Sequence, residues 1–459
     1  MPLHPSQQAI ALSPARFKVI RAGRRSGKTT YEIEAMLFKA VSAKHQNVFY
    51  IAPTQLQARS IVWNELLKRL GNIGEKNEQR LEIKVPTREG GTSLIKIAGW
   101  ENRENFRGMK AHHITFDEVD TCKDFFIGWQ EIFRPALIDT GGTADFIGTP
   151  KKENPNLRRL EKEAGSDWAM FKFTTKDNPH IPPHEIEAAR ESMDADTYKQ
   201  EILAEYVDNA GALFKYSALI DLFSNTIPKG NDKFLTVDIA DDGSDKTIFT
   251  FWHGLEVTRF DLYSQLLTDG VVNQIREDAA REHIPYSHVA VDAIGVGAGV
   301  ASSPLLHGIV GFKSSYGAIR TDHDIVRLPN VHYTNDAPLV TEYKNLRSQC
   351  LFLLASKVNQ HEIAIRTEDQ RIKSFIIEEL SHYQDASKGD GKRMATQKED
   401  IKELIGRSPD ITDTLIMRMY FEIRHRMLPQ EGEHGHIIAT AIDEHMSRNI
   451  ANQRLNSTI

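Results

Sequence analysis

The stretch RAGRRSGKTT, residues 21–30, constrains the fold of this chain more than any other part of it. Its glycines, and a lysine followed by a hydroxyl residue, are the arrangement of a P-loop, in which backbone N–H groups surround phosphate oxygens. The loop follows the apolar run KVI and precedes apolar residues at helical spacing, namely Ile33, Met36, Leu37, Ala40 and Val41. The sequence therefore predicts a strand, a phosphate-binding loop and a helix in succession.

The entrance of the loop departs from the usual pattern, because Ala22 stands where the first glycine is expected. A small residue still permits the turn, so we expect Lys28 to reach the β- and γ-phosphates of ATP and Thr29 to ligate Mg²⁺. Arg24 is also a candidate for stabilising charge in the transition state. The residues expected around the triphosphate are Gly23, Arg24, Arg25, Ser26, Gly27, Lys28, Thr29 and Thr30. A chance loop of small and basic residues is the alternative interpretation.

A second acidic element completes the expected nucleotide site. The run HHITFDEVD is an apolar strand that ends in Asp117 and Glu118. We expect Asp117 to hold the magnesium ion through water, and Glu118 to orient and deprotonate the attacking water. An acidic pair after a strand is common by itself, but it indicates ATP hydrolysis when a P-loop precedes it.

Smaller features fit around this site. Gln7 in HPSQQ is a candidate for contacting the adenine edge, with Gln8 in reserve, although either is equally consistent with a surface glutamine. Thr149 in FIGTP follows another strand and is placed to sense the γ-phosphate. Arg107 is a candidate for acting on the nucleotide of a neighbouring subunit.

The order of elements predicts an α/β chain with two domains. Alternating strands and helices from residue 18 to about residue 150 favour a mostly parallel sheet, as in P-loop ATPases of the RecA/ASCE-like class. FLTVDIA, KTIFTFW and EVTRFDLY then read as three antiparallel strands. A helix over 265–283, the strand SHVAVDA and helices over 338–357 and 408–426 follow, which is the order of a ribonuclease-H-like fold. We expect an ATPase domain over 1–229 with a linker region about 205–229, a nuclease domain over 230–430, and a tail over 431–459.

Carboxylates in the second domain indicate a metal-dependent nuclease. Asp238 lies inside an apolar strand and Asp292 ends another, where a charge is costly unless it binds a cation. Asp410 and Asp413 share one face at a helix start, and Asp245 is within reach of the cluster. Asp410 also fits a role in offsetting the helix dipole, so we prefer Asp413 as the third ligand. Such acids around two Mg²⁺ or Mn²⁺ ions would activate water for phosphodiester hydrolysis.

The composition limits the class of protein to which this chain can belong. The 459 residues are 40% hydrophobic and 26% charged, without an apolar run of eighteen residues or a cationic-then-apolar leader, so we expect a cytoplasmic protein without a membrane segment. Cys122 and Cys350 are too few for a disulfide framework and lack zinc-ligand spacing. The net charge of -6 does not exclude DNA as a partner, because a large enzyme keeps local basic surfaces.

An ATPase with P-loop, FDE and GTP elements, followed by an acidic nuclease, resembles the large terminase subunit of tailed bacteriophages. The resemblance implies that the Walker A, Walker B and coupling residues are Gly23, Gly27, Lys28, Thr29, Asp117, Glu118 and Thr149. It implies a nuclease triad of Asp238, Asp292 and Asp413. It also implies ATP-driven packaging of double-stranded DNA into a procapsid in the host cytoplasm, by a pentameric ring with a portal protein and a small terminase subunit as partners. The tail after about residue 430 is a candidate portal contact.

Two other functions remain open at this point. One is a helicase-nuclease of DNA repair, against which only one P-loop domain is visible. The other is a catalytically inactive DNA-binding assembly protein, which predicts loss of Lys28 or Glu118, yet both are present.

Overall fold

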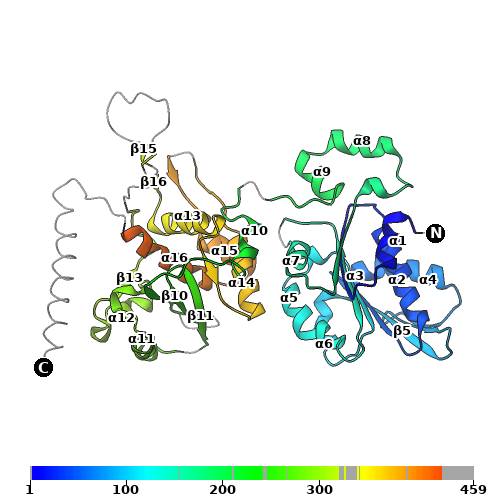
Figure 1. Ribbon diagram of the computed structural model, residues 1–459, viewed down its shortest axis with the longest axis horizontal. Helices are drawn as coiled ribbons and strands as arrows, with labels where there is room; N and C mark the ends of the chain where they lie inside the picture. Colours follow the sequence, from blue (N-terminus) through cyan, green and yellow to red (C-terminus); the bar gives the residue numbers. More distant parts are fainter. Residues whose placement is uncertain are drawn as a thin grey trace. The chain divides into compact units, whose positions relative to one another are not determined.

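The computed structural model divides the chain into two compact units (Figure 1). The first comprises Met1–Thr226 and Ala364–Tyr383, and the second comprises Ile227–Ile363 and Gln384–Ile459. The domain extents expected from the sequence stay a prediction, and the grouping of Ala364–Tyr383 with the first unit was not expected. The structure describes residues 3–152, 155–208, 211–240, 246–264, 266–319, 325–326, 339–340, 342–388 and 391–425.

An eight-stranded sheet in the order β3-β4-β5-β2-β6-β7-β1-β8 forms the centre of the first unit. Strands β5, β2, β6, β7, β1 and β8 are parallel, whereas β3 and β4 add an antiparallel edge. The bounds are β1 Phe17–Ala22, β2 Asn47–Ala52, β3 Glu75–Asn77, β4 Glu82–Pro86, β5 Thr92–Gly99, β6 His113–Phe116, β7 Thr143–Gly148 and β8 Trp168–Phe173. The predicted mostly parallel sheet is confirmed. Strands β3, β4 and β8 were not predicted individually. Strand β3 is exposed at all three positions, and β4 and β8 each contain exposed positions.

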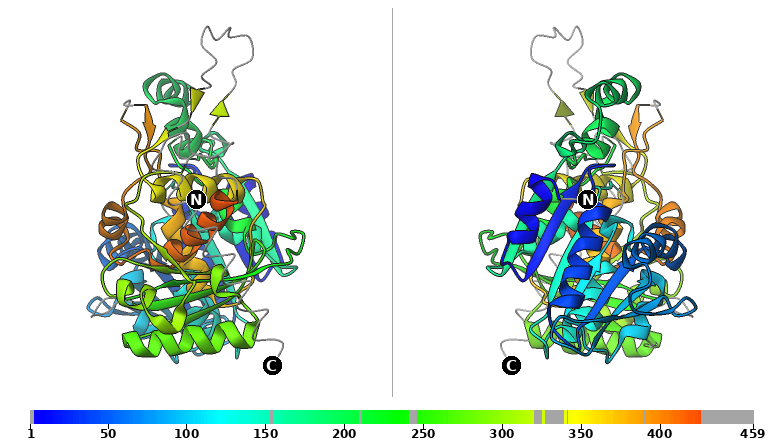
Figure 2. Two further views of the ribbon diagram at one scale, coloured as in Figure 1. Left: turned by 90° about the vertical axis from the view of Figure 1, so that its left-hand side faces the viewer. Right: turned by 90° about the vertical axis from the view of Figure 1, so that its right-hand side faces the viewer.

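Helices cover both faces of this sheet (Figure 2). Apolar side chains of α2, α3, η1 and α4 pack on one face, and those of α5, η4, α6 and α7 pack on the other. The bounds are α1 Pro5–Leu12, α2 Lys28–Ser42, α3 Gln55–Ala58, η1 Arg59–Trp63, α4 Asn64–Leu70, η2 Trp100–Phe106, η3 Val119–Thr121, α5 Phe125–Gly128, η4 Trp129–Phe133, α6 Arg134–Ala136, α7 Asn156–Glu163, η5 Thr175–Asp177, α8 Pro183–Ser192, α9 Ala195–Glu201 and α10 Tyr216–Asp221. Helix α3, η1 and α4 follow one another without a break and form one helical run from Gln55 to Leu70.

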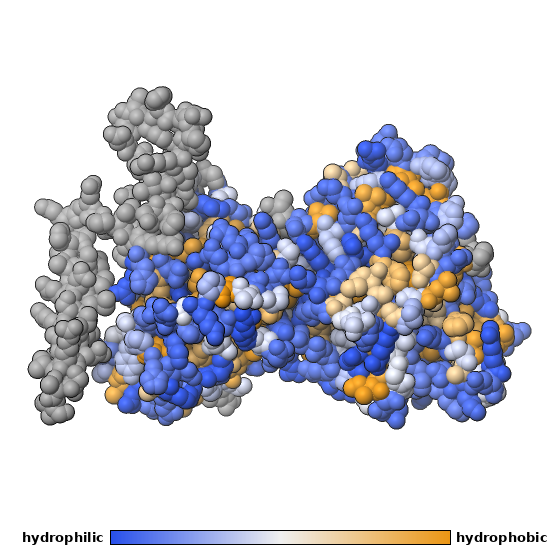
Figure 3. Space-filling view, in the orientation of Figure 1, coloured by the Kyte–Doolittle hydropathy of each residue, from blue (hydrophilic) through white to orange (hydrophobic). Residues whose placement is uncertain are grey.

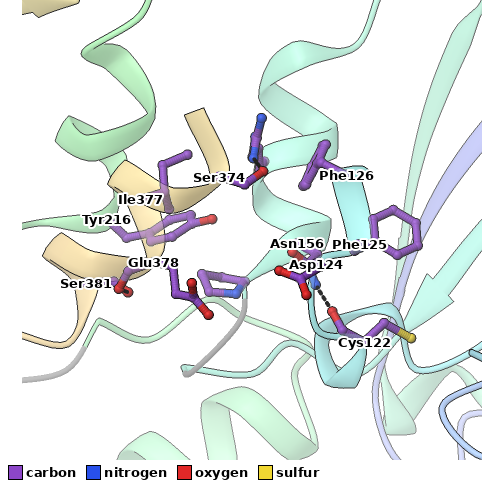
Figure 4. A pocket seen from close by; sticks show the side chains of 12 residues that line it. Cys122, Asp124, Phe125, Phe126, Asn156, Tyr216, Ser374, Ile377, Glu378 and Ser381 are labelled. Carbon is purple, nitrogen blue, oxygen red and sulfur yellow. Dashed lines mark hydrogen bonds between the residues drawn. The ribbon is translucent and has the colours of Figure 1, made fainter. Parts of the chain in front are cut away.

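The segment that returns to the first unit contains β17 Ala364–Ile365 and α14 Gln370–Ser381. Helix α14 is held there by Arg159, which donates to Gln370 Oε1 at 2.7 Å and to Ser374 Oγ at 3.1 Å. Ser374, Ile377 and Glu378 of α14 line one side of a cavity of about 50 Å³, opposite residues of α5 and α7 (Figure 4).

The second unit contains a sheet in which five strands run in the order β13-β12-β9-β10-β11. Strands β9, β10 and β11 are antiparallel neighbours, while β12 is parallel to β9 and β13 is parallel to β12. The bounds are β9 Lys233–Asp238, β10 Thr247–His253, β11 Glu256–Tyr263, β12 Val289–Asp292 and β13 Val310–Phe312. Three antiparallel strands followed by two parallel ones confirm the α/β order predicted for a ribonuclease-H-like fold.

Helices also cover both faces of the second sheet. Side chains of α11 and α12 join Leu235 and Val237 in one apolar cluster, whereas α16 packs against β9, β10 and β12 on the opposite face. The remaining bounds are α11 Thr268–Glu282, η6 Tyr286–His288, α12 Gly297–Ala301, η7 Pro304–Leu306, β14 Ile325–Val326, β15 Leu339–Val340, β16 Glu342–Tyr343, α13 Leu346–Asn359, β18 Lys392–Arg393, α15 Lys398–Ile405 and α16 Asp410–Arg424.

The sequence prediction places the start of one helix too early in the chain. The helix expected over 338–357 begins at Leu346, because Asn345 caps it by accepting a hydrogen bond from Ser348 N at 2.8 Å. Among the described residues no helix has the length and apolarity needed to cross a bilayer. The surface in view is mainly hydrophilic with scattered apolar patches (Figure 3).

Candidate nucleotide and metal sites

The predicted phosphate-binding loop joins β1 to α2. Gly27 has φ of 97° and precedes the first residue of α2, a left-handed conformation that glycine adopts without strain. Gly23 has no room for a side chain, since a Cβ there would lie 2.6 Å from the carbonyl oxygen of Ile202. Helix α2 therefore begins directly after the loop, and its first turn contains Lys28, Thr29 and Thr30. This is the geometry that a phosphate group requires.

The outer side of the loop is held by residues of the segment from η5 to α9. Thr175 Oγ1 donates to Arg24 O at 2.7 Å, and Asn178 Nδ2 donates to Arg25 O at 2.7 Å. The Arg24 side chain forms an ion pair with Glu201, which also accepts from Lys151 Nζ at 2.7 Å. Arg24 is thus engaged outside the loop in this structure, with its side chain 67% exposed.

Helix α1 supports the loop from the other side. Gln7 is 2% exposed, and its Nε2 donates to Gly27 O at 2.7 Å while its Oε1 accepts from His4 N at 2.9 Å. The Ser26 side chain is fully buried and donates to Gly23 O at 2.5 Å. Gln8 instead contacts Leu3 O at the surface. Of the two glutamines, only Gln7 lies at the loop, where its amide braces the backbone.

The predicted acidic pair lies beside the loop. Strand β6 is separated from β1 by β7, so Asp117 and Glu118 emerge at the same edge of the sheet as the loop. Lys28 Nζ forms an ion pair with Glu118 and lies 3.5 Å from Thr149 Oγ1. Burial opposes a charge on Lys28, but Asp117 and Glu118 offset this effect and raise its pKa. The structure therefore brings together the residues predicted for the P-loop, the acidic pair and the γ-phosphate sensor.

Asp117 is itself held from two directions. Tyr50 of β2 donates its hydroxyl to Asp117 Oδ2 at 2.6 Å, and the Glu118 N–H donates to Asp117 Oδ1 at 2.9 Å. Asp117 is 2% exposed, and burial is the main reason that its pKa is raised. A buried carboxylate with several carboxyl neighbours favours a cation.

The acids predicted for the second site also meet. Asp238 ends β9 and Asp292 ends the adjacent parallel strand β12, where Val237 and Val291 are register partners. Because Leu235 and Val237 face α11, Asp238 faces α16, whose first turn contains Asp410 and Asp413. Carboxylate oxygens of Asp238, Asp410 and Asp413 lie within 4.8 Å of one another. Both Asp410 and Asp413 therefore belong to the cluster.

Asp292 lies beside this cluster rather than inside it. Asp292 and Asp413 line one cavity of about 490 Å³. Burial, and then Asp413, raise the pKa of Asp292 to about 6, and burial and Asp413 also raise the pKa of Asp238. The predicted ligand Asp245 lies outside the described residues.

Two basic side chains reach the acidic site from other elements. Arg347 of α13 forms an ion pair with Asp413, and Lys398 Nζ lies 2.6 Å from Asp413 Oδ2 and 3.5 Å from Asp410 Oδ1. Burial by itself raises the pKa of Asp413, but Arg347 and Lys398 outweigh it and lower the pKa. Neither cation was predicted, because single basic residues beside a helix carry no motif.

Arg107, the candidate for action on a neighbouring subunit, lies at the end of η2. It pairs with Glu104 at 2.5 Å and with Glu131 at 3.2 Å, and its side chain is 49% exposed. Glu131 also pairs with Arg371 of the returning segment at 2.6 Å. No contact with the loop or with Asp117 is seen for Arg107 among the described residues.

Comparisons with known proteins give a common result. Residues 19–220 match the family described as the N-terminal part of the T4likevirus-type terminase large subunit. The large terminase subunit of Escherichia phage T5 is 25% identical over 213 residues, covering 45% of this chain and 47% of that protein. The large terminase subunit of Thermus phage G20c is 27% identical over 168 residues, covering 33% of this chain and 34% of that protein. The chain thus spans about half or less of the length of these curated relatives.

Solved structures were also compared. The large terminase of a thermophilic bacteriophage is 16% identical, with 92% of this chain and 98% of that chain covered and a TM-score of 0.41. The large terminase ATPase domain of Thermus phage P74-26 is 23% identical, covering 45% of this chain and 94% of that chain with a TM-score of 0.40. Through the family match over residues 19–220 and the relatives in phages T5 and G20c, the chain is similar to the large terminase subunits of phages.

Proposed function

We propose that this protein is an ATP-driven motor that packages double-stranded viral DNA into a procapsid, and that it also cuts concatemeric DNA with a metal-dependent nuclease. The observation that carries the proposal is that two clusters of side chains, each suited to one of these reactions, lie in separate units. In the first unit Lys28 meets Glu118 at a P-loop, and in the second unit Asp238, Asp410 and Asp413 converge. The family match and the curated relatives support this combination.

The nucleotide site fits Mg²⁺ and ATP. The N-terminus of α2 and Lys28 supply positive charge for the phosphates, while Thr29 and Asp117 supply oxygens of the kind that Mg²⁺ prefers. Once phosphates engage Lys28, Glu118 is released to orient the attacking water and accept its proton. Bound magnesium would neutralise charge on the phosphates. Arg24 reaches the phosphates only after leaving Glu201.

The acidic site fits divalent cations, because buried carboxylates from two elements lie within 4.8 Å of one another. Asp238, Asp410, Asp413 and Asp292 would hold Mg²⁺ or Mn²⁺, and Asp245 remains a proposed ligand. The metal would activate water and stabilise the leaving oxygen in phosphodiester hydrolysis. Lys398 and Arg347 keep Asp413 ionised and in place.

We also propose the partners that such a motor requires. They are double-stranded DNA, a portal protein, a small terminase subunit and further copies of this chain in a pentameric ring, acting in the host cytoplasm. Arg107 is the proposed residue for acting across subunits, since its side chain is accessible. The tail over 431–459, proposed as a portal contact, lies outside the described residues.

The decisive experiment separates the two activities by mutation. Lys28→Ala and Glu118→Gln should abolish ATP hydrolysis and leave plasmid cutting in Mn²⁺ intact, whereas Asp238→Asn should do the reverse. Asp261→Asn, which alters a carboxylate on β11 away from the cluster, is the matched control and should retain both activities. Wild-type protein that neither hydrolyses ATP nor cuts DNA would support the inactive assembly protein instead.

A further inference from the structure

A buried side chain that the proposed chemistry does not use lies against Asp117. Tyr50 is fully buried on β2 and donates to Asp117 Oδ2 at 2.6 Å. Its hydroxyl lies in the layer beneath the phosphate-binding loop.

The sheet places these two side chains on one face. Tyr50 pairs with Thr115 in register, and Asp117 lies two residues beyond Thr115 on the same face. The sheet therefore aims Tyr50 and Asp117 at one another.

Such an arrangement restricts the Asp117 side chain. A buried tyrosine hydroxyl that donates to a carboxylate is a strong hydrogen bond in a place without water. Outer partners of this kind fix the orientation of a metal ligand and raise the affinity for the metal.

We propose that Tyr50 is a positioning residue that holds the Asp117 carboxylate beneath Lys28 and so sets the affinity of the nucleotide site for its divalent cation. This inference rests on the proposed ATPase function. Tyr50 belongs to β2 and Asp117 follows β6, so the cation site joins these two strands. Tyr50 does not touch the nucleotide in this assignment.

The test uses a matched pair of tyrosines. Tyr50→Phe removes one hydroxyl without changing the packing, and Tyr31→Phe removes an equivalent buried bond, because Tyr31 donates to Asp145 Oδ2 at 2.7 Å. Mn²⁺ binding in the presence of ADP is measured by electron paramagnetic resonance, together with the Mg²⁺ concentration that gives half-maximal ATP hydrolysis. Tyr50→Phe should weaken Mn²⁺ binding by about 10- to 100-fold and raise the Mg²⁺ concentration for half-maximal hydrolysis by a similar factor. Tyr31→Phe should leave both at the wild-type value.

A measurement without metal isolates the effect on the cation. Binding of ADP measured in EDTA should be the same for wild type, Tyr50→Phe and Tyr31→Phe.

Specific outcomes would overturn the inference. Equal Mn²⁺ affinities for Tyr50→Phe and Tyr31→Phe would remove Tyr50 from the role. Because these readings require a wild-type enzyme that hydrolyses ATP with Mg²⁺, absence of that activity would refute the proposed function and not merely this inference.

Discussion

Acidification should weaken metal binding at the second site through Asp292. The pKa of this carboxyl is raised to about 6, chiefly by burial and then by Asp413. A metal ligand must be ionised, so each pH unit below 6 should lower the Mn²⁺ affinity about tenfold for this one proton. Between pH 7.5 and pH 5 the expected loss is about tenfold, and Asp238, whose pKa is also raised, can only add to it.

The same shift makes a prediction for stability. The pKa of Asp292 in the folded protein lies about two units above its ordinary value of 3.8, so the folded state retains a proton that the unfolded chain has released. This contribution is fully present below pH 3.8 and is lost as the pH rises through 6, at a cost of about 3 kcal/mol in the free energy of unfolding. Mn²⁺ reverses the loss because it binds the ionised form. The stabilising effect of Mn²⁺ should therefore increase with pH.

The assay combines isothermal titration with Mn²⁺ and thermal unfolding with and without Mn²⁺, at pH values from 5 to 7.5. Asp292→Asn should bind Mn²⁺ more weakly throughout, and its affinity should depend on pH by one proton less than that of wild type. Asp261→Asn is the control and should keep the wild-type dependence. The reasoning is refuted if the wild-type affinity is the same at pH 5 and pH 7.5, or if Asp292→Asn retains the full slope.

Two further predictions concern the first unit. Gly27→Ala should lower the free energy of unfolding by about 1–3 kcal/mol and weaken ADP binding, because φ is 97° and a Cβ would lie 2.7 Å from Gln7 Nε2. Gly90→Ala has a similar φ of 82° in open space, and ADP titration should show unaltered binding. His113 is buried and its pKa is lowered to about 4, so acid should destabilise wild type as the pH falls from 6.5 through 4, by about 3 kcal/mol in total. Urea unfolding at several pH values should show that this part of the acid sensitivity is missing in His113→Asn.

The sequence predicted those parts of the sites that lie next to one another along the chain. Apolar runs that end in Asp117 and Asp292 or contain Asp238 predicted the strands that bear the acids, because period and burial are local signals. Asp238 was expected inside its strand, but it is the last residue of β9. Glu201 and Lys398 were not predicted as site residues. Each reaches its site only through the tertiary fold, and in the sequence it resembles a surface charge. The return of α14 to the first unit has no local signal either.

A common geometry underlies both sites, and the residues in one helical turn decide which ion each site favours. In both units, parallel strands end at one edge of a sheet, and a helix begins above that edge. The first turn of α2 contains Lys28, which reinforces the positive helix end and favours phosphate. The first turn of α16 contains Asp410 and Asp413, which outweigh the helix end and favour cations. In each case the opposite charge comes from the strand ends or from a neighbouring helix, so one arrangement of backbone serves the two proposed reactions.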